Sequence, residues 1–233
     1  MVVRDNKNMN RILDEDMMDD DHLSTSTETP MREDAFLLTD EEKITLIQEK
    51  FSDIMNIMGL DLNDDSLKGT PKRVAKMFIQ EIFSGLNPKN KPEIKVFENK
   101  YQYDSVLVEK NIKVNSFCEH HFLPIVGKAH VGYIPKNKVV GLSKLNRVVD
   151  YFSRRPQVQE RLTKQILEEL VETLFTDDVI VVIDAVHLCV SARGVKDLSS
   201  STQTIQYSGR FTDIRFREEF FKLISLNQNG YQV

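Results

Sequence analysis

The sequence predicts an α+β fold built on an antiparallel sheet, and two observations favour this class. The expected element order is two helices, two strands, two helices, two strands and a final helix, and paired strands separated by helices are typical of it. The chain has 233 residues, 40% of them apolar, which is enough for the core of one large domain. We see no internal repeat and expect no second globular domain.

The first ordered elements are expected to be two helices. Thr39 and Glu42 have the spacing of a capping box, and the apolar residues that follow recur at helical spacing up to Gly59, which supplies a stop. A second helix is expected to begin around Pro71, because proline favours the first helical position, and to end at Gly85.

From about residue 103 the pattern changes to strands that alternate with amphipathic helices. Alternating or continuous apolar residues predict strands, whereas apolar residues three and four apart predict helices. The expected strands cover 106–117, 127–135, 178–193 and 200–212, and the expected helices cover the residues after Gly141, 157–175 and 213–226.

Acidic residues are concentrated near the N-terminus. Residues 1–34 contain ten of the 36 acids but only four of the 31 bases, so the rest of the chain is close to neutral. This polar, aperiodic stretch cannot bury enough apolar surface to offset the entropy of ordering it. We therefore predict a disordered acidic arm at 1–36, an N-terminal helical part at 37–100 and a main domain at 101–233.

The composition also limits the classes of function. The near-neutral body gives no argument for a nucleic-acid partner. The sequence contains no run of 18 apolar residues that predicts a membrane span, and no pattern of a secretory signal. Two cysteines do not make a disulfide framework. We expect a cytoplasmic protein with reduced thiols and no membrane partner.

The stretch FCEHHF concentrates residues that are suited to a metal. Cys118 and His121 have the C-x₂-H spacing of a zinc half-site, and His187 with Cys189 supplies a second half-site. If the second segment is a strand, residues i and i+2 face the same way, and both side chains point into one site. Thiolate and imidazole ligands favour Zn²⁺ over Mg²⁺ or Ca²⁺.

The spacing leaves the type of site open. Either cysteine alone would be an ordinary buried residue. Four protein ligands would close the site and make it structural, whereas three would leave a position for water and make it catalytic. The neighbouring His120 favours the catalytic arrangement, because a structural site has no use for a spare proton carrier.

A second group of residues is suited to an anion. Ser143 is expected where a helix begins, and free N–H groups and the positive end of the helix dipole favour phosphate there. Lys144 and Arg147 add positive charge nearby, Arg193 follows the second half-site, and Arg73 opens the second helix. Each residue alone is typical of a solvated surface, so it is their grouping that suggests a phosphate site.

Several long stretches resemble GTP cyclohydrolase I, the zinc-dependent enzyme that opens pterin synthesis. They are SFCEHHFLPIVGKAHVGYIP, GLSKLNRVVDYFSRRPQVQERLTKQI and DAVHLCVSARGV, and TPKRVAKMFIQEIFSGL is similar to the family's N-terminal helical part. The resemblance covers residues 40–226. It implies a tunnelling (T-) fold, with helices on one side of the sheet, 101–233 as the catalytic domain, and assembly into a toroidal homodecamer.

The resemblance also implies a reaction, in which GTP and water give formate and 7,8-dihydroneopterin triphosphate. The implied zinc ligands are Cys118, His121 and Cys189, and the implied acid–base residues are His120 and His187. The implied substrate-binding residues are Glu160 for the guanine ring with Gln159 beside it, and Ser143, Lys144, Arg147, Arg193 and Arg73 for the phosphates. Two competing hypotheses are a zinc-stabilised binding module with a closed four-ligand site, and another T-fold enzyme that lacks this metal site.

Overall fold

A computed structural model describes residues 25–226 of the chain, and from Met31 onward these residues belong to one compact unit. The acidic arm predicted for 1–36 lies mostly outside the described residues, and its described part, 25–36, contains turns rather than a helix or strand. Within residues 25–226, no helix is long and apolar enough to cross a bilayer.

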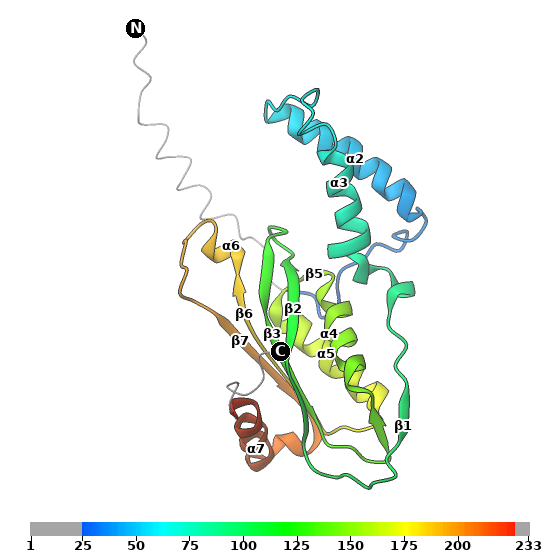
Figure 1. Cartoon of the computed structure of the whole chain (residues 1–233), viewed down its shortest axis with the longest axis vertical. Helices are drawn as coiled ribbons and strands as arrows, with labels where there is room; N and C mark the ends of the chain where they lie inside the picture. Colours follow the sequence, from blue (N-terminus) through cyan, green and yellow to red (C-terminus); the bar gives the residue numbers. More distant parts are fainter. Residues whose placement is uncertain (1–24, 227–233) are drawn as a thin grey trace. The chain divides into compact units, whose positions relative to one another are not determined.

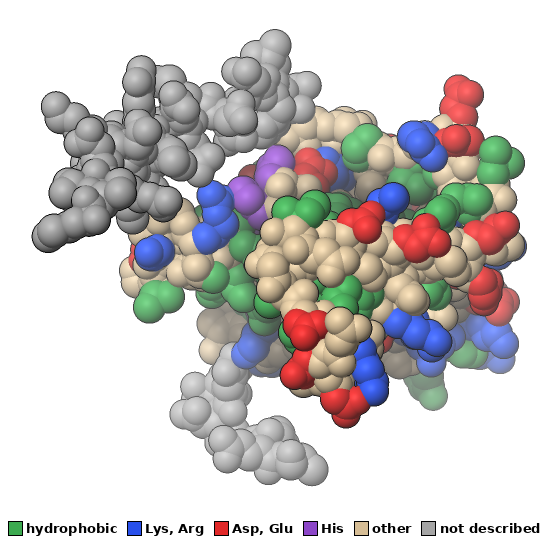
Figure 2. Space-filling view, turned by 90° about the horizontal axis from the view of Figure 1, so that it is seen from above, with side chains coloured by type: hydrophobic (Ala, Val, Ile, Leu, Met, Phe, Trp, Pro, Cys, Tyr) green, Lys and Arg blue, Asp and Glu red, His purple; other side chains and the backbone are tan. Residues whose placement is uncertain are grey.

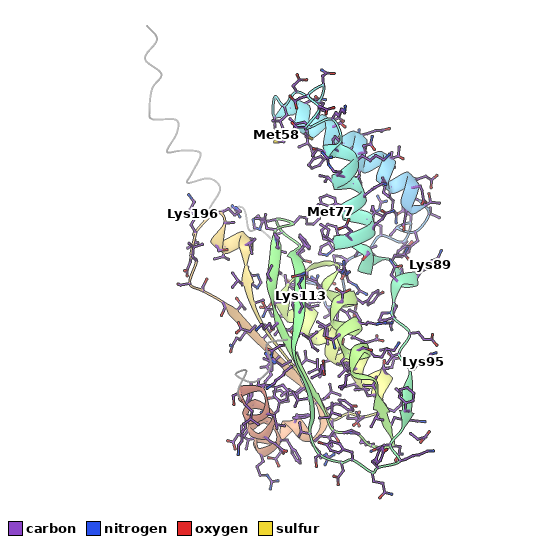
Figure 3. All side chains as sticks on the ribbon, in the orientation of Figure 1. Met58, Met77, Lys89, Lys95, Lys113 and Lys196 are labelled. Carbon is purple, nitrogen blue, oxygen red and sulfur yellow. The ribbon has the colours of Figure 1, made fainter. Side chains whose placement is uncertain are left out.

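The N-terminal helical part begins as the sequence predicts. Helix α2 (Asp40–Ile57) opens on a complete capping box, in which the Glu42 N–H donates to Thr39 Oγ1 at 3.2 Å and the Thr39 N–H donates to Glu42 Oε2 at 2.8 Å. The helix ends at Ile57, with Met58, labelled in Figure 3, as its C-cap residue. Gly59 follows with φ +80°, a conformation that favours glycine.

The second predicted helix is not uniform. Helix α3 (Thr70–Lys76) has proline in its first turn, but from Met77 the chain widens into a π-helix (Met77–Ile82) and then a 3₁₀ turn (Ser84–Leu86). Gly85 does more than end a helix, because a Cβ there would lie 2.1 Å from the Tyr151 carbonyl oxygen. Glycine is therefore required for this close approach to the backbone at Tyr151.

The core of the fold is a five-stranded sheet in the order β5-β2-β3-β6-β7. All of its strand pairs are antiparallel except β5 with β2. The strands are β2 (Leu107–Cys118), β3 (Pro124–Tyr133), β5 (Pro156–Gln157), β6 (Val179–His187) and β7 (Thr202–Tyr207). A separate pair, β1 (Val96–Glu98) and β4 (Lys138–Val140), and the two-residue β5 are not predicted by the sequence pattern.

Helices cover both faces of the sheet, so the expectation of helices on one side is wrong. Helices α4 (Leu142–Ser153) and α5 (Gln159–Leu174) pack on one face over a buried apolar cluster, and α7 (Ile214–Ser225) packs on the other (Figure 1). The reason is that alternate residues of β6, such as Ile180, point away from α4 and α5. Phe220 of α7 buries them, and it lies so close that a Cβ on Gly132 would be 2.6 Å from its ring.

Four segments finish or begin together at one end of this sheet, which we call the site end. Strand β2 ends there at Cys118, which pairs with Gln157 of β5, and β6 ends there at His187, opposite Ile125 of β3. Helix α5 also begins there, at Gln159. In Figure 1 these ends lie together at the top of the sheet.

The predicted strand 178–193 is too long. The strand stops at His187, and residues Leu188–Ser191 form a one-turn helix, α6. The expectation that His187 and Cys189 face the same way as alternate strand residues is therefore wrong. Side chains in a helical turn do not alternate between two faces as they do in a strand, so the Cys189 side chain does not continue the alternation of β6.

Candidate metal centre and active site

Three of the predicted metal ligands meet at the site end. Cys118 at the end of β2, His121 in the turn that follows and Cys189 in α6 each offer one ligand atom, and these atoms lie within 4.8 Å of one another. The distance from Cys118 Sγ to His121 Nδ1 is 3.9 Å. Residues almost 70 positions apart thus converge, as the two half-sites in the sequence predict.

The donor set fits zinc. Tetrahedral zinc with sulfur at about 2.3 Å and nitrogen at about 2.0 Å requires ligand atoms about 3.5–3.8 Å apart. The Cys118–His121 distance is close to this range. The other distances between ligand atoms are at most 4.8 Å, so they would have to shorten by no more than about 1 Å when a metal binds. Two thiols and one imidazole are also the donors that favour zinc over the hard cations.

Cys118 influences the ionisation of Cys189. Burial, followed by the charge of Cys118 and a hydrogen bond with it, raises the pKa of Cys189 to about 11. The nearby charge of Arg193 lowers that pKa, but by less. Two sulfurs this close resist ionising together, and a bound dication favours the thiolate form of both.

His187 is not part of the metal cluster. Its ring nitrogen Nε2 lies 2.8 Å from Gln159 Oε1, and the cluster of Cys118, His121 and Cys189 does not include it. This arrangement favours three protein ligands over the closed four-ligand site. His120 lies beside the cluster, with its Nδ1 3.5 Å from Cys118 Sγ. Figure 2 shows histidine side chains at the surface of the site end, with basic and acidic side chains near them.

The environment of His187 moves its pKa in two directions. Burial lowers the pKa, because it disfavours the charged ring, and the negative charge of Glu160 raises it. Glu160 stands in the first turn of α5 and is exposed, whereas Gln159 is buried. The two neighbours therefore occupy different surroundings, although the sequence places them together.

A tight turn presents the two histidines of the CEHHF stretch, which we call the metal loop (residues 118–122). The Phe122 N–H donates to the Cys118 carbonyl at 2.8 Å, and Phe122 has φ +52°, which is unusual for a bulky residue. Its ring is held by Phe83 at 4.9 Å and Phe78 at 6.3 Å between centroids. The i→i+5 bonding of the π-helix places these two rings on one face, so it explains how the helical part supports the loop.

Sequence reasoning misses a buried ion pair behind the metal loop. Arg161 of α5 donates two hydrogen bonds to Glu119, at 2.7 and 3.0 Å, and its side chain is 2% exposed. The Glu119 N–H also donates to the Gln157 carbonyl at 3.0 Å. The only available signal is the position of Glu119 between a cysteine and a histidine, and Arg161 resembles any helical surface charge.

The predicted phosphate residues do not gather in one protomer. Arg193 is at the site end, where its Nη1 lies 2.5 Å from His121 Nε2. Ser143, Lys144 and Arg147 are in the first two turns of α4, beside Asn146. Asn146 bonds to Glu109 near the start of β2, roughly 30 Å from Cys118 at about 3.3 Å per residue.

Arg73 is also distant in sequence and in surroundings. It belongs to α3 and donates to the Ser66 carbonyl and to Thr70 Oγ1, both at 3.3 Å. The structure therefore brings only part of the predicted site together. The residues that meet at the site end are Cys118, His120, His121, Gln159, Glu160, His187, Cys189 and Arg193.

Comparisons with known proteins identify the family of this chain. The family model for GTP cyclohydrolase I matches residues 47–225. A "GTP cyclohydrolase 1" from Flavobacterium johnsoniae is 54% identical over 219 residues, covering 93% of this chain and 98% of the relative. The "GTP cyclohydrolase 1" of Yersinia enterocolitica is 48% identical, covering 88% of this chain and 93% of the relative, and that of Pectobacterium carotovorum is 50% identical, covering 87% and 91%.

Solved structures add little. An archaeosine synthase QueF-Like in the apo form aligns with a TM-score of 0.38 at 19% identity, covering 45% of this chain and 94% of that one, which is too low to carry an argument. The sequence relatives and the family model decide the matter, since both cover most of the chain. The chain belongs to the GTP cyclohydrolase I family of enzymes.

Proposed function

We propose that this enzyme uses zinc to hydrolyse and rearrange GTP into 7,8-dihydroneopterin triphosphate and formate, the first step of pterin synthesis towards tetrahydrofolate or tetrahydrobiopterin. The observation that carries the proposal is the three-ligand cluster of Cys118, His121 and Cys189. His120 and His187 stand close to this cluster without belonging to it, as acid–base groups should.

The cluster would hold zinc with one coordination position left for solvent. When bound, zinc supplies activation of water as a nucleophile at neutral pH. The raised pKa of Cys189 means that metal binding displaces protons from the thiols, so affinity for zinc rises with pH.

The two histidines carry the proton transfers. Guanine C8 is a weak electrophile, and a proton placed on N7 makes it more reactive. We assign this role to His187. Burial lowers its pKa on balance, and the negative charge of Glu160 partly offsets that effect by favouring the protonated ring. Attack at C8 opens the imidazole ring to a formamide, and a second hydrolysis releases formate with help from His120. The ribose then opens, rearranges to a ketone and closes onto the freed amine.

Glu160 is the residue proposed to recognise guanine. Its exposed carboxylate can accept hydrogen bonds from guanine N1–H and from the 2-amino group. Adenine offers neither donor in this arrangement, so a site built around the carboxylate would reject ATP strongly.

The triphosphate site requires a second copy of the chain. Ser143, Lys144 and Arg147 lie in the first half of α4, where Asn146 contacts Glu109, nine residues before the metal ligand Cys118 along β2. We infer that they serve a neighbouring protomer's metal cluster, which fits the toroidal homodecamer that the family resemblance implies. Arg73, held in the helical part, is proposed to add charge near the phosphates from another position in the ring.

Arg193 is proposed to join the triphosphate site when metal binds. In the structure it donates to His121 Nε2, since arginine can only donate. A metal on Nδ1 would leave the proton on Nε2, and a metal on Nε2 would displace the arginine. In either case a metal held by His121 would be incompatible with this contact, and the Arg193 guanidinium would be available to phosphate.

The direct test is a GTP assay on zinc-loaded protein, with and without a chelator. We expect the dihydroneopterin chromophore and one equivalent of formate with zinc, and neither after chelation. Activity on a different substrate only would contradict the proposal. A His187→Ala variant distinguishes the proposed enzyme from a zinc-stabilised binding module. The enzyme should keep zinc and lose turnover, whereas a closed four-ligand site that included His187 would lose zinc.

A further inference from the structure

Gln159 is one of the most deeply buried polar residues at the site end, with 1% of its side chain exposed. Its side-chain nitrogen Nε2, which carries two protons, has three acceptors within hydrogen-bonding distance: the Ile183 carbonyl at 3.1 Å, the Thr202 carbonyl at 2.8 Å and Thr204 Oγ1 at 3.1 Å. Its oxygen Oε1 lies 2.8 Å from His187 Nε2. Every polar atom of this amide is thus engaged by the protein itself.

The orientation of the amide is fixed by its partners. Two of the three atoms around Nε2 are backbone carbonyl oxygens, which can only accept a hydrogen bond. A reversed amide would place its oxygen against both of them, where two acceptors make no hydrogen bond, and for the buried Ile183 carbonyl this costs about 1–3 kcal/mol. The atom that faces His187 is therefore the amide oxygen, and an amide oxygen only accepts.

Two threonines reinforce the direction of this chain of hydrogen bonds. Thr163 Oγ1 donates to the Gln159 carbonyl at 2.7 Å, which uses its only proton. The bond of 2.6 Å between the two hydroxyls must then be donated by Thr204. Thr204 Oγ1 in turn can accept from the Gln159 amide, whose two protons are shared among three acceptors, so the threonines are consistent with the nitrogen facing this side.

We propose that Gln159 is a positioning residue for His187, which holds the neutral ring with its proton on Nε2 and leaves Nδ1 as the nitrogen that exchanges a proton with the substrate. The inference rests on the acid–base role given to His187 above. In each cycle Nδ1 takes up one proton to form the imidazolium and returns it, while the Nε2 proton remains bonded to Gln159.

This role differs from guanine binding, which the family resemblance assigns to Glu160 with Gln159 beside it. Successive residues of a helix point about 100° apart, so a buried Gln159 and an exposed Glu160 can serve different partners. The described residues 25–226 make no hydrogen bond to His187 Nδ1, so that nitrogen is the one able to meet a substrate.

The first experiment needs no variant. Zinc-loaded protein labelled with ¹⁵N at histidine is studied by solid-state NMR at a pH where the ring is neutral, and the His187 signals are assigned by their loss in His187→Gln. We expect a protonated Nε2 and an unprotonated Nδ1. The opposite tautomer would overturn the proposal. This reading is independent of turnover, so a protein that fails to convert GTP would refute the proposed function and leave the tautomer decided.

The second experiment measures kcat and KM for GTP in Gln159→Met, which keeps the volume and removes the amide. We expect kcat to fall at least about tenfold, since positioned acid–base catalysis contributes about 10²–10⁴. The KM for GTP and the zinc content should stay within about twofold of wild type. A higher KM with kcat retained would show instead that Gln159 binds guanine.

A matched control separates positioning from general stability. Gln157 is also a fully buried glutamine, whose amide donates to the Phe152 carbonyl at 3.0 Å and to Gln165 Oε1 at 2.9 Å but does not touch His187. Gln157→Met should lose stability comparably and keep the His187 tautomer and most of kcat. An equal fall of kcat in both variants would overturn the positioning role.

Discussion

Removal of Arg161 should loosen the metal loop and speed the loss of metal. Arg161→Met breaks two hydrogen bonds to Glu119, of 2.7 and 3.0 Å, and leaves a carboxylate that is 19% exposed without this partner. Removing one member of a buried ion pair costs about 3–5 kcal/mol, and the lower value applies because Glu119 keeps some contact with water. About 3 kcal/mol corresponds to a population of the detached loop that is roughly 100-fold larger.

The assay is transfer of zinc to a chromophoric chelator, followed in wild type, Arg161→Met, Glu119→Gln and the double variant. If release passes through the detached loop, the transfer rate of Arg161→Met should rise up to roughly 100-fold. The change in transfer free energy of activation in the double variant should be smaller than the sum of the changes in the two single variants, since residues in contact couple by about 0.5–3 kcal/mol.

The control is a pair on the same helix that is open to water. Lys164 and Glu168 are 3.6 Å apart and about half exposed, so Glu168→Gln should change stability by less than about 1 kcal/mol and leave zinc transfer unchanged. Zinc transfer at the wild-type rate in Arg161→Met, or strictly additive effects in the cycle, would refute the reasoning.

Three further predictions concern recognition, the loop and pH. Glu160→Ala should reduce the preference for GTP over ATP, measured as the ratio of kcat/KM values, by at least about tenfold, and an unchanged ratio would exclude its role. Phe122→Ala should weaken zinc binding in chelator competition about tenfold, since aromatic pairs with Phe78 and Phe83 contribute about 0.5–1.5 kcal/mol each; Phe122→Leu should lose less. Burial, then the charge of Lys128, lowers the pKa of His130, so its neutral form is favoured in the folded state. The contribution of His130 to the free energy of unfolding is therefore complete above the unfolded pKa of about 6.5 and falls as the pH drops through it. His130→Gln should reduce the change of the unfolding midpoint between about pH 7.5 and 5.5. A pH dependence equal to that of wild type would contradict this cause.

Local signals in the sequence predict most of the regular elements. The capping box at Thr39, the positive-φ stop at Gly59 and the amphipathic helix beginning near residue 157 are all confirmed, because each depends on neighbours within one or two turns. The metal cluster is also confirmed as a group, since cysteine and histidine are rare in this chain and therefore informative.

Other features could not be predicted because their signals are ambiguous or distant. The apolar run continues from His187 through Val190, so periodicity alone does not reveal that β6 turns into α6. Helix α7 covers the face of the sheet on which alternate residues of β6 would otherwise be exposed. The amphipathic pattern of the helix shows that it packs on a sheet but not on which face.

The polar network behind the site depends on contacts between distant segments. Gln159 meets Thr204 from 45 positions away, and Glu119 meets Arg161 from 42. A buried glutamine and a buried arginine look like solvated helical residues until the fold surrounds them. The sequence therefore indicates the groups that perform chemistry more readily than the groups that orient them.

The length of β2 has a genetic consequence, because the strand runs from Glu109, which contacts Asn146 of α4, to Cys118 at the site end. Under the proposed assembly, each active site takes Cys189 from one protomer and Lys144 from its neighbour. A defect at Cys189 and a defect at Lys144 in one protomer therefore damage two different sites. Two inactive alleles, one of each kind, should then complement when expressed together, restoring about a quarter of the sites in a randomly mixed ring. Two alleles that alter the same half should not rescue each other.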